Sequence, residues 1–218
     1  MYSDKLIEIT QDAACVIRNG KEDAIGFFTD NIQSCLIYII TTELATIAIH
    51  DSGQLGVDQL ANFIRSHGKV CSIALVHGPD LNEVNKKRLP SLLSMIGFGK
   101  DYETVRSRFN IFSVVYELNN GVSIYPNTRP KNVYGLPNKD MVQSIVELNN
   151  TFIPLNSQSL PLDVQFYEGD YCNNSRLFFS LDEMLKICDA QPEYIEINRM
   201  FLLKGHIAGL FTLPKDFI

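Results

Sequence analysis

The sequence lacks a strongly basic region. Among its 218 residues, 19 are Lys or Arg and 25 are Asp or Glu, so the formal net charge is −6. Its longest basic cluster, Lys86-Lys87-Arg88, falls inside a predicted helix. Because a protein that neutralises phosphates needs a basic face, this composition argues against nucleic acid as a partner.

Long apolar runs are also missing. No stretch reaches the roughly 20 apolar residues that cross a bilayer, so no membrane span is expected. The first residues, MYSDKLIEIT, have no basic region followed by an apolar one, and we therefore expect no classical signal peptide. A cytoplasmic site of action is expected, and export by a specialised secretion system is compatible with this start.

The cysteines are few and far apart, and no two of them form a Cys-x-x-Cys motif. An odd number with wide spacing is typical of reduced thiols rather than of a disulfide framework or a zinc site. We therefore expect no zinc site, and nothing else in the sequence calls for a metal or a cofactor. The cysteines are Cys15, Cys35, Cys71, Cys172 and Cys188.

Apolar segments of strand length dominate the first part of the chain. Predicted strands cover residues 6–10, 13–18, 24–29, 34–41, 45–51, 70–76, 110–118 and 122–125. The segments 34–41 and 45–51 are apolar on both faces, which is typical of central strands. One helix is predicted from Val57 to near Gly68, and another starts with Asp80 as its N-cap and kinks or restarts at Pro90.

The second part of the chain is more irregular. Helices are predicted at 139–148 and 181–188, and strands at 164–167 and 194–203. The segments 126–138 and 150–174 are rich in Pro, Asn and aromatic residues, so they are candidates either for recognition of a partner or for cover of a sheet edge. No linker is visible, which predicts a single domain over 1–218, with a core at about 1–118 and a C-terminal elaboration at about 119–218. The predicted class is α/β (α+β), with a mixed, largely antiparallel sheet and flanking helices.

One cysteine and one histidine lie on two neighbouring predicted strands. If the hairpin turn is centred between Thr42 and Glu43, antiparallel pairing places Cys35 opposite His50. Directly opposite residues hold their Cβ atoms about 5 Å apart, which is close enough for an imidazole to activate a thiol. The alternative is that both are core residues, because free cysteines are commonly buried and a lone histidine on a strand is usually satisfied by its surroundings.

The residues around this pair resemble the cysteine-dependent deamidase superfamily. That superfamily includes the chemoreceptor glutamine deamidase CheD, the catalytic domains of cytotoxic necrotizing factors, Burkholderia lethal factor and the N-terminal asparagine amidohydrolase. Its members have a short Gly/Ser motif that ends in Cys, followed by a His on the next strand, and several have a Thr before the motif. Here the motif is Ile32-Gln33-Ser34-Cys35, His50 follows, and Thr29 stands at the threonine position. The resemblance covers about residues 24–95.

The resemblance implies an α/β/β/α-like core and a Cys–His dyad that deamidates a protein glutamine. Cys35 is then the nucleophile, His50 the proton carrier and Thr29 the residue that orients His50, while Ser34 and Gln33 supply backbone around the oxyanion. Thr29 is otherwise an ordinary strand end. The implied partner is a protein that presents a glutamine, as for an effector or toxin acting on a host protein.

Several alternatives stay open at this point. Gln33 replaces the glycine of the motif, which strains the backbone or narrows the pocket if that position needs a positive φ or a close approach. Asp30 and Asp51 flank the site and are alternative partners for His50. The same dyad would also serve an N-terminal asparagine or glutamine amidohydrolase, a protease or a transglutaminase-like enzyme, and a non-catalytic binding domain could keep the fold. If the dyad works, the pKa of Cys35 should lie below the usual value of about 8.5 and Cys35 should be the most reactive cysteine.

Overall fold

The computed structural model describes residues 6–20, 24–134, 162–168 and 171–174, together with single residues at 203, 206, 212, 213 and 215. The chain divides into two compact units. One unit holds residues 1–135 and 161–175, and the other holds 136–160 and 176–218. All the strands and helices named below belong to the first unit.

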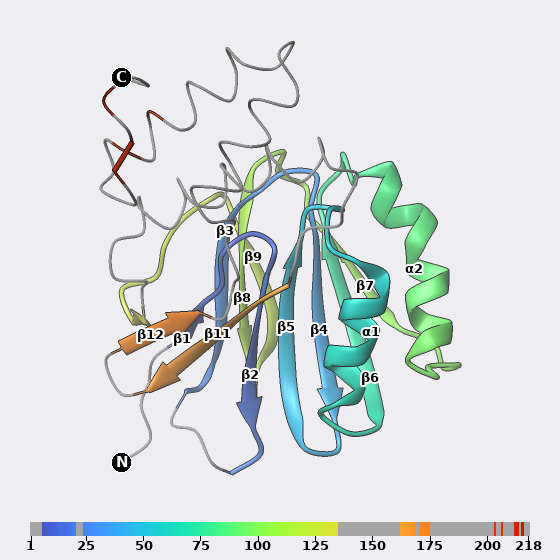
Figure 1. The fold of residues 1–218 in the computed structure, drawn as a ribbon. Coiled ribbons are helices and arrows are strands. Elements are labelled where there is room, and N and C mark those ends of the chain that lie inside the picture. Colours follow the sequence, from blue (N-terminus) through green and yellow to red (C-terminus); the bar gives the residue numbers. More distant parts are fainter. Residues whose placement is uncertain are drawn as a thin grey trace. The chain divides into compact units, whose positions relative to one another are not determined.

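The first unit contains two mixed sheets (Figure 1). The five-stranded sheet has the order β10-β1-β3-β8-β9. In it, β1 is parallel to β10 and β3, whereas β3, β8 and β9 are antiparallel in turn. Its strands are β1 (Leu6–Glu8), β3 (Gly26–Ile32), β8 (Phe112–Glu117), β9 (Gly121–Tyr125) and β10 (Val133–Tyr134).

The seven-stranded sheet has the order β12-β11-β2-β5-β4-β6-β7. Its centre, from β2 to β6, is antiparallel, while β11 is parallel to β2 and β7 is parallel to β6. Its strands are β2 (Ala13–Arg18), β4 (Leu36–Thr42), β5 (Ala45–Asp51), β6 (Val70–His77), β7 (Glu103–Arg106), β11 (Asp163–Glu168) and β12 (Tyr171–Asn174).

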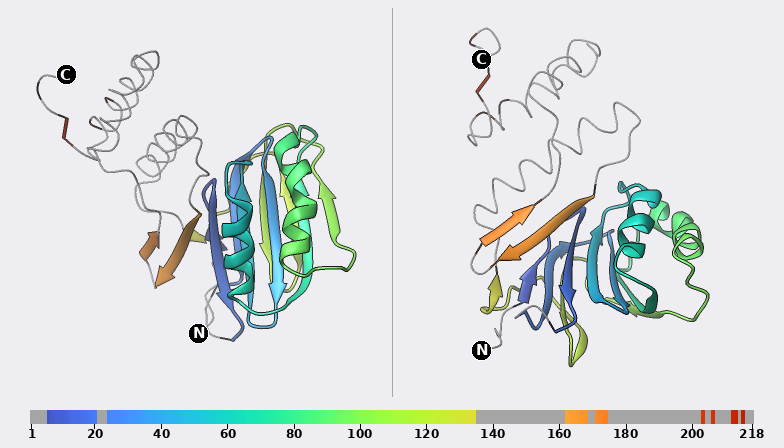
Figure 2. Two further views of the ribbon diagram at one scale, coloured as in Figure 1. Left: turned by 45° about the vertical axis from the view of Figure 1, so that its right-hand side comes forward. Right: turned by 60° about the horizontal axis from the view of Figure 1, so that its bottom comes forward.

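Two helices, α1 (Val57–Arg65) and α2 (Glu83–Met95), stand side by side against the central strands of the seven-stranded sheet (Figure 2). Helix α1 buries Leu60, Ala61 and Ile64, three residues of its predicted apolar stripe. The mixed α+β class is therefore confirmed, and the described residues supply one helical layer. Within those residues, no helix is long and apolar enough to cross a membrane.

Side chains alternate between two buried layers along the central strands. On β4, Ile37 and Ile39 belong to the core between the two sheets. Tyr38 and Ile40 are at most 1% exposed and point the other way, toward the helices. Both faces of β4 and β5 are thus buried, as expected from the apolar residues on both of their faces.

The strands and helices predicted in the first part of the chain are found, although several of their bounds shift by a few residues; β3, for example, continues past its predicted end at residue 29 to Ile32. β2, β5 and the start of α1 lie where they were predicted. The N-cap of α2 is Asn82 rather than Asp80, because the Asn82 side chain accepts a hydrogen bond from the backbone N of Val84 (2.8 Å). α2 also runs through Pro90 as one helix instead of restarting there. β7 was missed because it is short and mostly exposed.

The irregular segments contain some regular structure. Within 126–138, β10 pairs with β1 and forms the edge of its sheet, and within 150–174, β11 is longer than predicted and β12 was not predicted. The helices predicted at 139–148 and 181–188 lie outside the described residues. So does most of the strand predicted at 194–203, and its last residue, Leu203, is helical.

Candidate active site

A hydrogen bond between Thr29 and His50 links the two sheets. Thr29 lies on β3 and His50 on β5, and Oγ1 of Thr29 is 2.7 Å from Nδ1 of His50. Each residue is 3% exposed. In its own sheet His50 lies between Ala13 and Ile37, which both face the core between the sheets. The bond therefore fixes the imidazole inside this core.

The second ring nitrogen of His50 is left without a partner. Nε2 is buried and makes no hydrogen bond within the described part of the chain. When Nδ1–H donates to the Thr29 hydroxyl, Nε2 carries the lone pair and can accept a proton. This arrangement supplies a base in an apolar setting, provided that a proton donor reaches Nε2.

The predicted register of the β4–β5 hairpin is wrong by two residues. Ile37, and not Cys35, stands opposite His50, and the last pair before the turn is Thr41 with Thr46. Thr42 is the last residue of β4, and its hydroxyl accepts a hydrogen bond from the backbone N of Ala45 on the other side of the turn (3.0 Å). This contact moves the centre of the turn to the bond between Glu43 and Leu44.

Cys35 nevertheless lies on the same side of the sheet as His50. It precedes β4 and belongs to the core between the sheets, with 7% of its surface exposed. Because it comes two residues before Ile37, it is a diagonal neighbour of His50, a relation in which the residues lie about 7–8 Å apart. The structure thus gathers Cys35, His50 and Thr29 in one region, without a hydrogen bond between the thiol and Nε2.

The motif residues before Cys35 are held by close backbone contacts. The strain considered for Gln33 is not found, because its φ is not positive; the left-handed residue nearby is Asn31, near the end of β3, with φ of 55°. The close approach falls on Gly78 instead, where an added Cβ would lie 2.8 Å from the carbonyl oxygen of Gln33. The carbonyl of Ser34 accepts a hydrogen bond from the backbone N of Asn82 (2.8 Å). An oxyanion role for Ser34 and Gln33 stays a prediction.

Asp12 is a site residue that the sequence analysis missed. It follows β1, it is fully buried, and its φ is 57°. Its backbone N donates to the carbonyl of His50 (2.7 Å), and its carboxylate accepts from the backbone N and the hydroxyl of Ser52 (2.9 and 3.0 Å). In the sequence, Gln11-Asp12 between two apolar segments has the composition of an ordinary turn, so no signal marked it.

Neither acidic alternative to Thr29 is brought to His50. Asp51 follows His50 on β5 and so points to the opposite face, where it is fully buried and forms an ion pair with Arg88 of α2. Its other oxygen accepts from the backbone N of Gly53 (2.9 Å). Asp30 follows Thr29 on β3. The prediction of Asp51 as the partner of His50 is therefore wrong, and its role is to attach α2 to the end of β5.

Burial sets the charge states of the dyad. It lowers the pKa of His50 to about 4, and the nearby carboxylate of Asp12 opposes this shift. Burial also raises the pKa of the Cys35 thiol to about 12, and Asp12 adds to that shift. The expectation of a Cys35 pKa below the usual thiol value is wrong for this structure, because burial and the Asp12 carboxylate both raise this pKa. At neutral pH the site holds a neutral thiol and a neutral imidazole.

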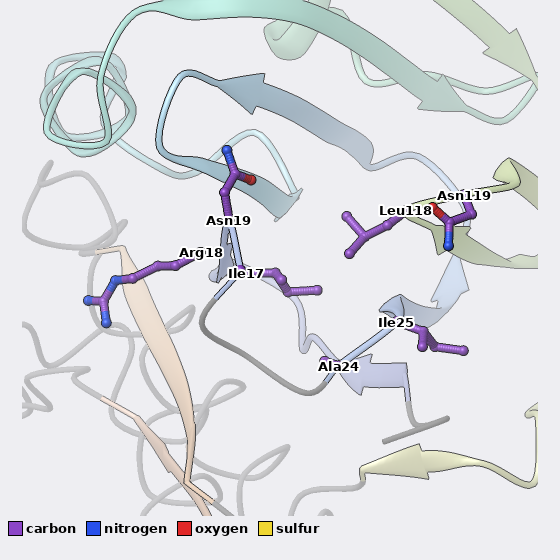
Figure 3. Close-up of a pocket in the computed structure, with 8 residues that line it drawn as sticks. Ile17, Arg18, Asn19, Ala24, Ile25, Leu118 and Asn119 are labelled. Atoms are coloured by element: carbon purple, nitrogen blue, oxygen red, sulfur yellow. The ribbon is translucent and has the colours of Figure 1, made fainter. Parts of the chain in front are cut away.

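A hollow elsewhere in the first unit is separate from these residues (Figure 3). It has a volume of about 560 Å³, and its lining comes from the ends of β2 and β8 and the start of β3. Ile17 lines it, whereas Ala13, at the other end of β2, is the neighbour of His50. These two positions on one strand are roughly 13 Å apart, so the hollow does not give access to Cys35.

Comparison with known proteins adds no relative. No family model matches the chain, and a search of curated proteins finds no match to it. The resemblance to cysteine-dependent deamidases therefore depends on the residues themselves and on the geometry that joins Thr29, His50 and Cys35.

Proposed function

We propose that this protein is a cysteine-dependent hydrolase that converts a glutamine side-chain amide of a protein to glutamate with release of ammonia. The observation that carries the proposal is the 2.7 Å hydrogen bond between Thr29 and His50 across the two sheets. It orients a buried imidazole and leaves Nε2 unpaired within the described residues, on the side of the sheet where Cys35 lies. A structural histidine would more commonly have both ring nitrogens paired.

The neutral dyad favours general-base catalysis over a preformed thiolate. His50 Nε2 takes the proton of Cys35 as Sγ attacks the carboxamide carbon, and a tetrahedral intermediate forms. His50 then gives this proton to the amide nitrogen, the C–N bond breaks, and ammonia leaves. Water, deprotonated by His50, attacks the remaining thioester, which yields glutamate and restores the thiol. Throughout, the Thr29 hydroxyl accepts the hydrogen bond from Nδ1.

The first step requires a short movement at Cys35. The thiol does not yet meet Nε2, and Cys35 is almost fully covered. The residue lies in a connection between β3 and β4, which can shift more readily than the strands on either side. We propose that docking of the target protein displaces this connection and brings Sγ into contact with both Nε2 and the amide carbon.

A second candidate is a non-catalytic binding domain that keeps the same core. The burial of Cys35 and its raised pKa favour this reading, since a catalytic thiol is usually accessible and readily ionised. In this case the Thr29–His50 bond serves only to join the two sheets.

Cysteine reactivity separates the two candidates. Iodoacetamide labelling of the whole chain, followed by peptide mapping, gives a rate for each cysteine. Cys71 is exposed, so its rate measures the reactivity of the reagent with an accessible thiol. Cys15, 2% exposed in the same core, gives the rate expected of a cysteine that is only structural. Under the proposed function, Cys35 reacts much faster than Cys15, and His50→Phe and Thr29→Val slow Cys35 alone. Equal rates for Cys35 and Cys15 would support the binding domain.

The activity itself is tested in cells. The wild-type chain and its Cys35→Ser variant are expressed side by side, and proteins are searched by mass spectrometry for glutamines converted to glutamate. The proposal requires conversions that depend on Cys35 and that recur at a defined site. If the two samples show the same conversions, the deamidase proposal is wrong.

A further inference from the structure

The buried carboxylate of Asp12 is unusual in its position. Asp12 takes part in a short connection between β1 and β2, it is fully buried, and its backbone is left-handed with φ of 57°. A non-glycine residue in this region is strained, so surrounding contacts must hold it there. Those contacts are made with the segment of main chain that contains His50.

Asp12 holds this chain at two points. Its backbone N donates to the carbonyl of His50 (2.7 Å), and its two carboxylate oxygens accept from the backbone N and the hydroxyl of Ser52 (2.9 and 3.0 Å). Gln11 donates a further hydrogen bond to the same carboxylate (3.1 Å). The main chain on both sides of Asp51 is therefore fixed by one residue from another strand connection.

The charge of Asp12 also reaches the dyad. The carboxylate acts on both His50 and Cys35, and in each case it favours the protonated form. The other charged groups nearby, Asp51 and Arg88, pair with each other on the helix side of the sheet. The Asp12 carboxylate thus opposes the loss of a proton from either group.

We propose that Asp12 is a positioning residue of this site: it fixes the main chain of His50, and its buried carboxylate stabilises the protonated imidazole that must donate a proton to the leaving ammonia. This inference rests on the proposed function. The proton that reaches His50 Nε2 comes from the Cys35 thiol and leaves on the amide nitrogen, so an imidazolium exists between the two transfers. A nearby carboxylate stabilises that cation, but it also disfavours a free Cys35 thiolate.

Two opposite effects are therefore expected from Asp12→Asn, which removes the charge and keeps the size. Alkylation of Cys35 by iodoacetamide at a fixed alkaline pH should become faster by roughly tenfold, the change that one pKa unit produces. Release of ammonia from carbobenzoxy-glutaminyl-glycine should become slower by roughly tenfold or more. Hydrolysis of p-nitrophenyl acetate, whose leaving group needs no proton, should be affected least.

Asp101→Asn is the matched control, because it makes the same chemical change at an exposed carboxylate. Ser52→Ala is a second variant that removes one donor to Asp12 and keeps the charge. It should retain the wild-type alkylation profile and lower ammonia release by a few-fold, which keeps the inference testable if Asp12→Asn does not fold.

The outcomes separate this inference from the proposed function. If the wild type releases no ammonia in a Cys35-dependent manner, the proposed function fails on this substrate, while the alkylation rates still test the charge effect of Asp12. If Asp12→Asn slows alkylation and both hydrolyses equally, Asp12 is only structural and the inference is wrong. Wild-type ammonia release by Ser52→Ala would overturn the positioning role.

Discussion

Replacing Thr29 by valine removes one hydroxyl, keeps the branched shape, and so isolates the hydrogen bond to His50. Both residues are 3% exposed and the two atoms are 2.7 Å apart. Without the hydroxyl, Nδ1 joins Nε2 as a second buried ring nitrogen that lacks a partner. Leaving a buried polar atom unpaired costs about 1–3 kcal/mol, so we expect the free energy of unfolding to fall by about 2 kcal/mol.

The assay is urea unfolding followed by circular dichroism, combined with a thermal scan in which a loss of this size lowers Tm by about 4–8 °C. A double-mutant cycle with His50→Phe isolates the pair. If the bond is as drawn, Thr29→Val costs much less when His50 is already phenylalanine, with a coupling of at least about 1 kcal/mol. On the same samples, Thr29→Val should also lower ammonia release and Cys35 alkylation, because His50 loses the contact that orients its ring.

Thr46→Val is the control for this change. Thr46 is also 3% exposed and lies on the same face of β5, four residues before His50. The same substitution there removes a buried hydroxyl without touching the imidazole. The reasoning is refuted if Thr29→Val leaves stability within about 0.5 kcal/mol of the wild type, or if its effect adds independently to that of His50→Phe.

Three further changes test other parts of the site. Burial lowers the pKa of His50 from 6.5 to about 4, so the unfolded chain takes up this proton first as the pH falls; unfolding near pH 5 should cost about 2 kcal/mol less than at neutral pH, and His50→Phe should lack this part of the acid loss. Burial raises the pKa of Cys35 from 9.0 to about 12, so its contribution is complete below pH 9 and is lost as the pH rises toward 12; alkaline unfolding of Cys35→Ala should lack that loss. Arg88→Leu leaves the buried Asp51 carboxylate without its ion pair and should lower stability by about 3–5 kcal/mol in urea unfolding, whereas Lys87→Leu, at an exposed position of the same helix, should change it little.

The strands of the site could be predicted from the sequence because their patterns are local. β2 and β5 are mostly apolar and end at polar turns, and both were predicted at their observed bounds. Thr29, Cys35 and His50 were singled out as well, and the structure gathers them. Their chemical role was inferred from the resemblance, and it stays a prediction.

The register of the hairpin could not be predicted because one side chain decides it. Thr41 and Thr42 are the same residue type, but it is the Thr42 hydroxyl that bonds to Ala45 across the turn. A register shift of two residues keeps every side chain on its face. For this reason both strands are buried as expected from the sequence, although the predicted partner of His50 is wrong.

The environment of the thiol also depends on contacts that the sequence does not reveal. The residues that cover Cys35 come from both sheets, and Asp12 reaches the site from the connection between β1 and β2. Desolvation follows from this packing, so the sign of the Cys35 pKa shift could not be read from its neighbours on the chain.

The segment at 126–138, a candidate for partner recognition, is attached to the motif. The side chain of Asn127 donates to Oδ1 of Asn31 (3.0 Å) and accepts from its backbone N (2.9 Å). The same segment continues into β10, which covers the edge of β1. The segment can therefore cover a sheet edge and also take part in recognition, because one end of it pairs with β1 while the other contacts Asn31, close to Cys35 in the sequence.

The packing that orients His50 also keeps the Cys35 thiol neutral and covered. Burial makes the Thr29–His50 bond strong and specific, but the same burial holds Cys35 neutral and covered. A site with these properties cannot act until the connection carrying Cys35 moves. That connection is held at Ser34 by Asn82, and the end of β3 that leads into it is held at Asn31 by Asn127. Any partner that loosens either contact would uncover the thiol while leaving the imidazole in place. If the protein is an enzyme, its selectivity for a target can therefore reside in these two contacts as well as in the recognition of the glutamine.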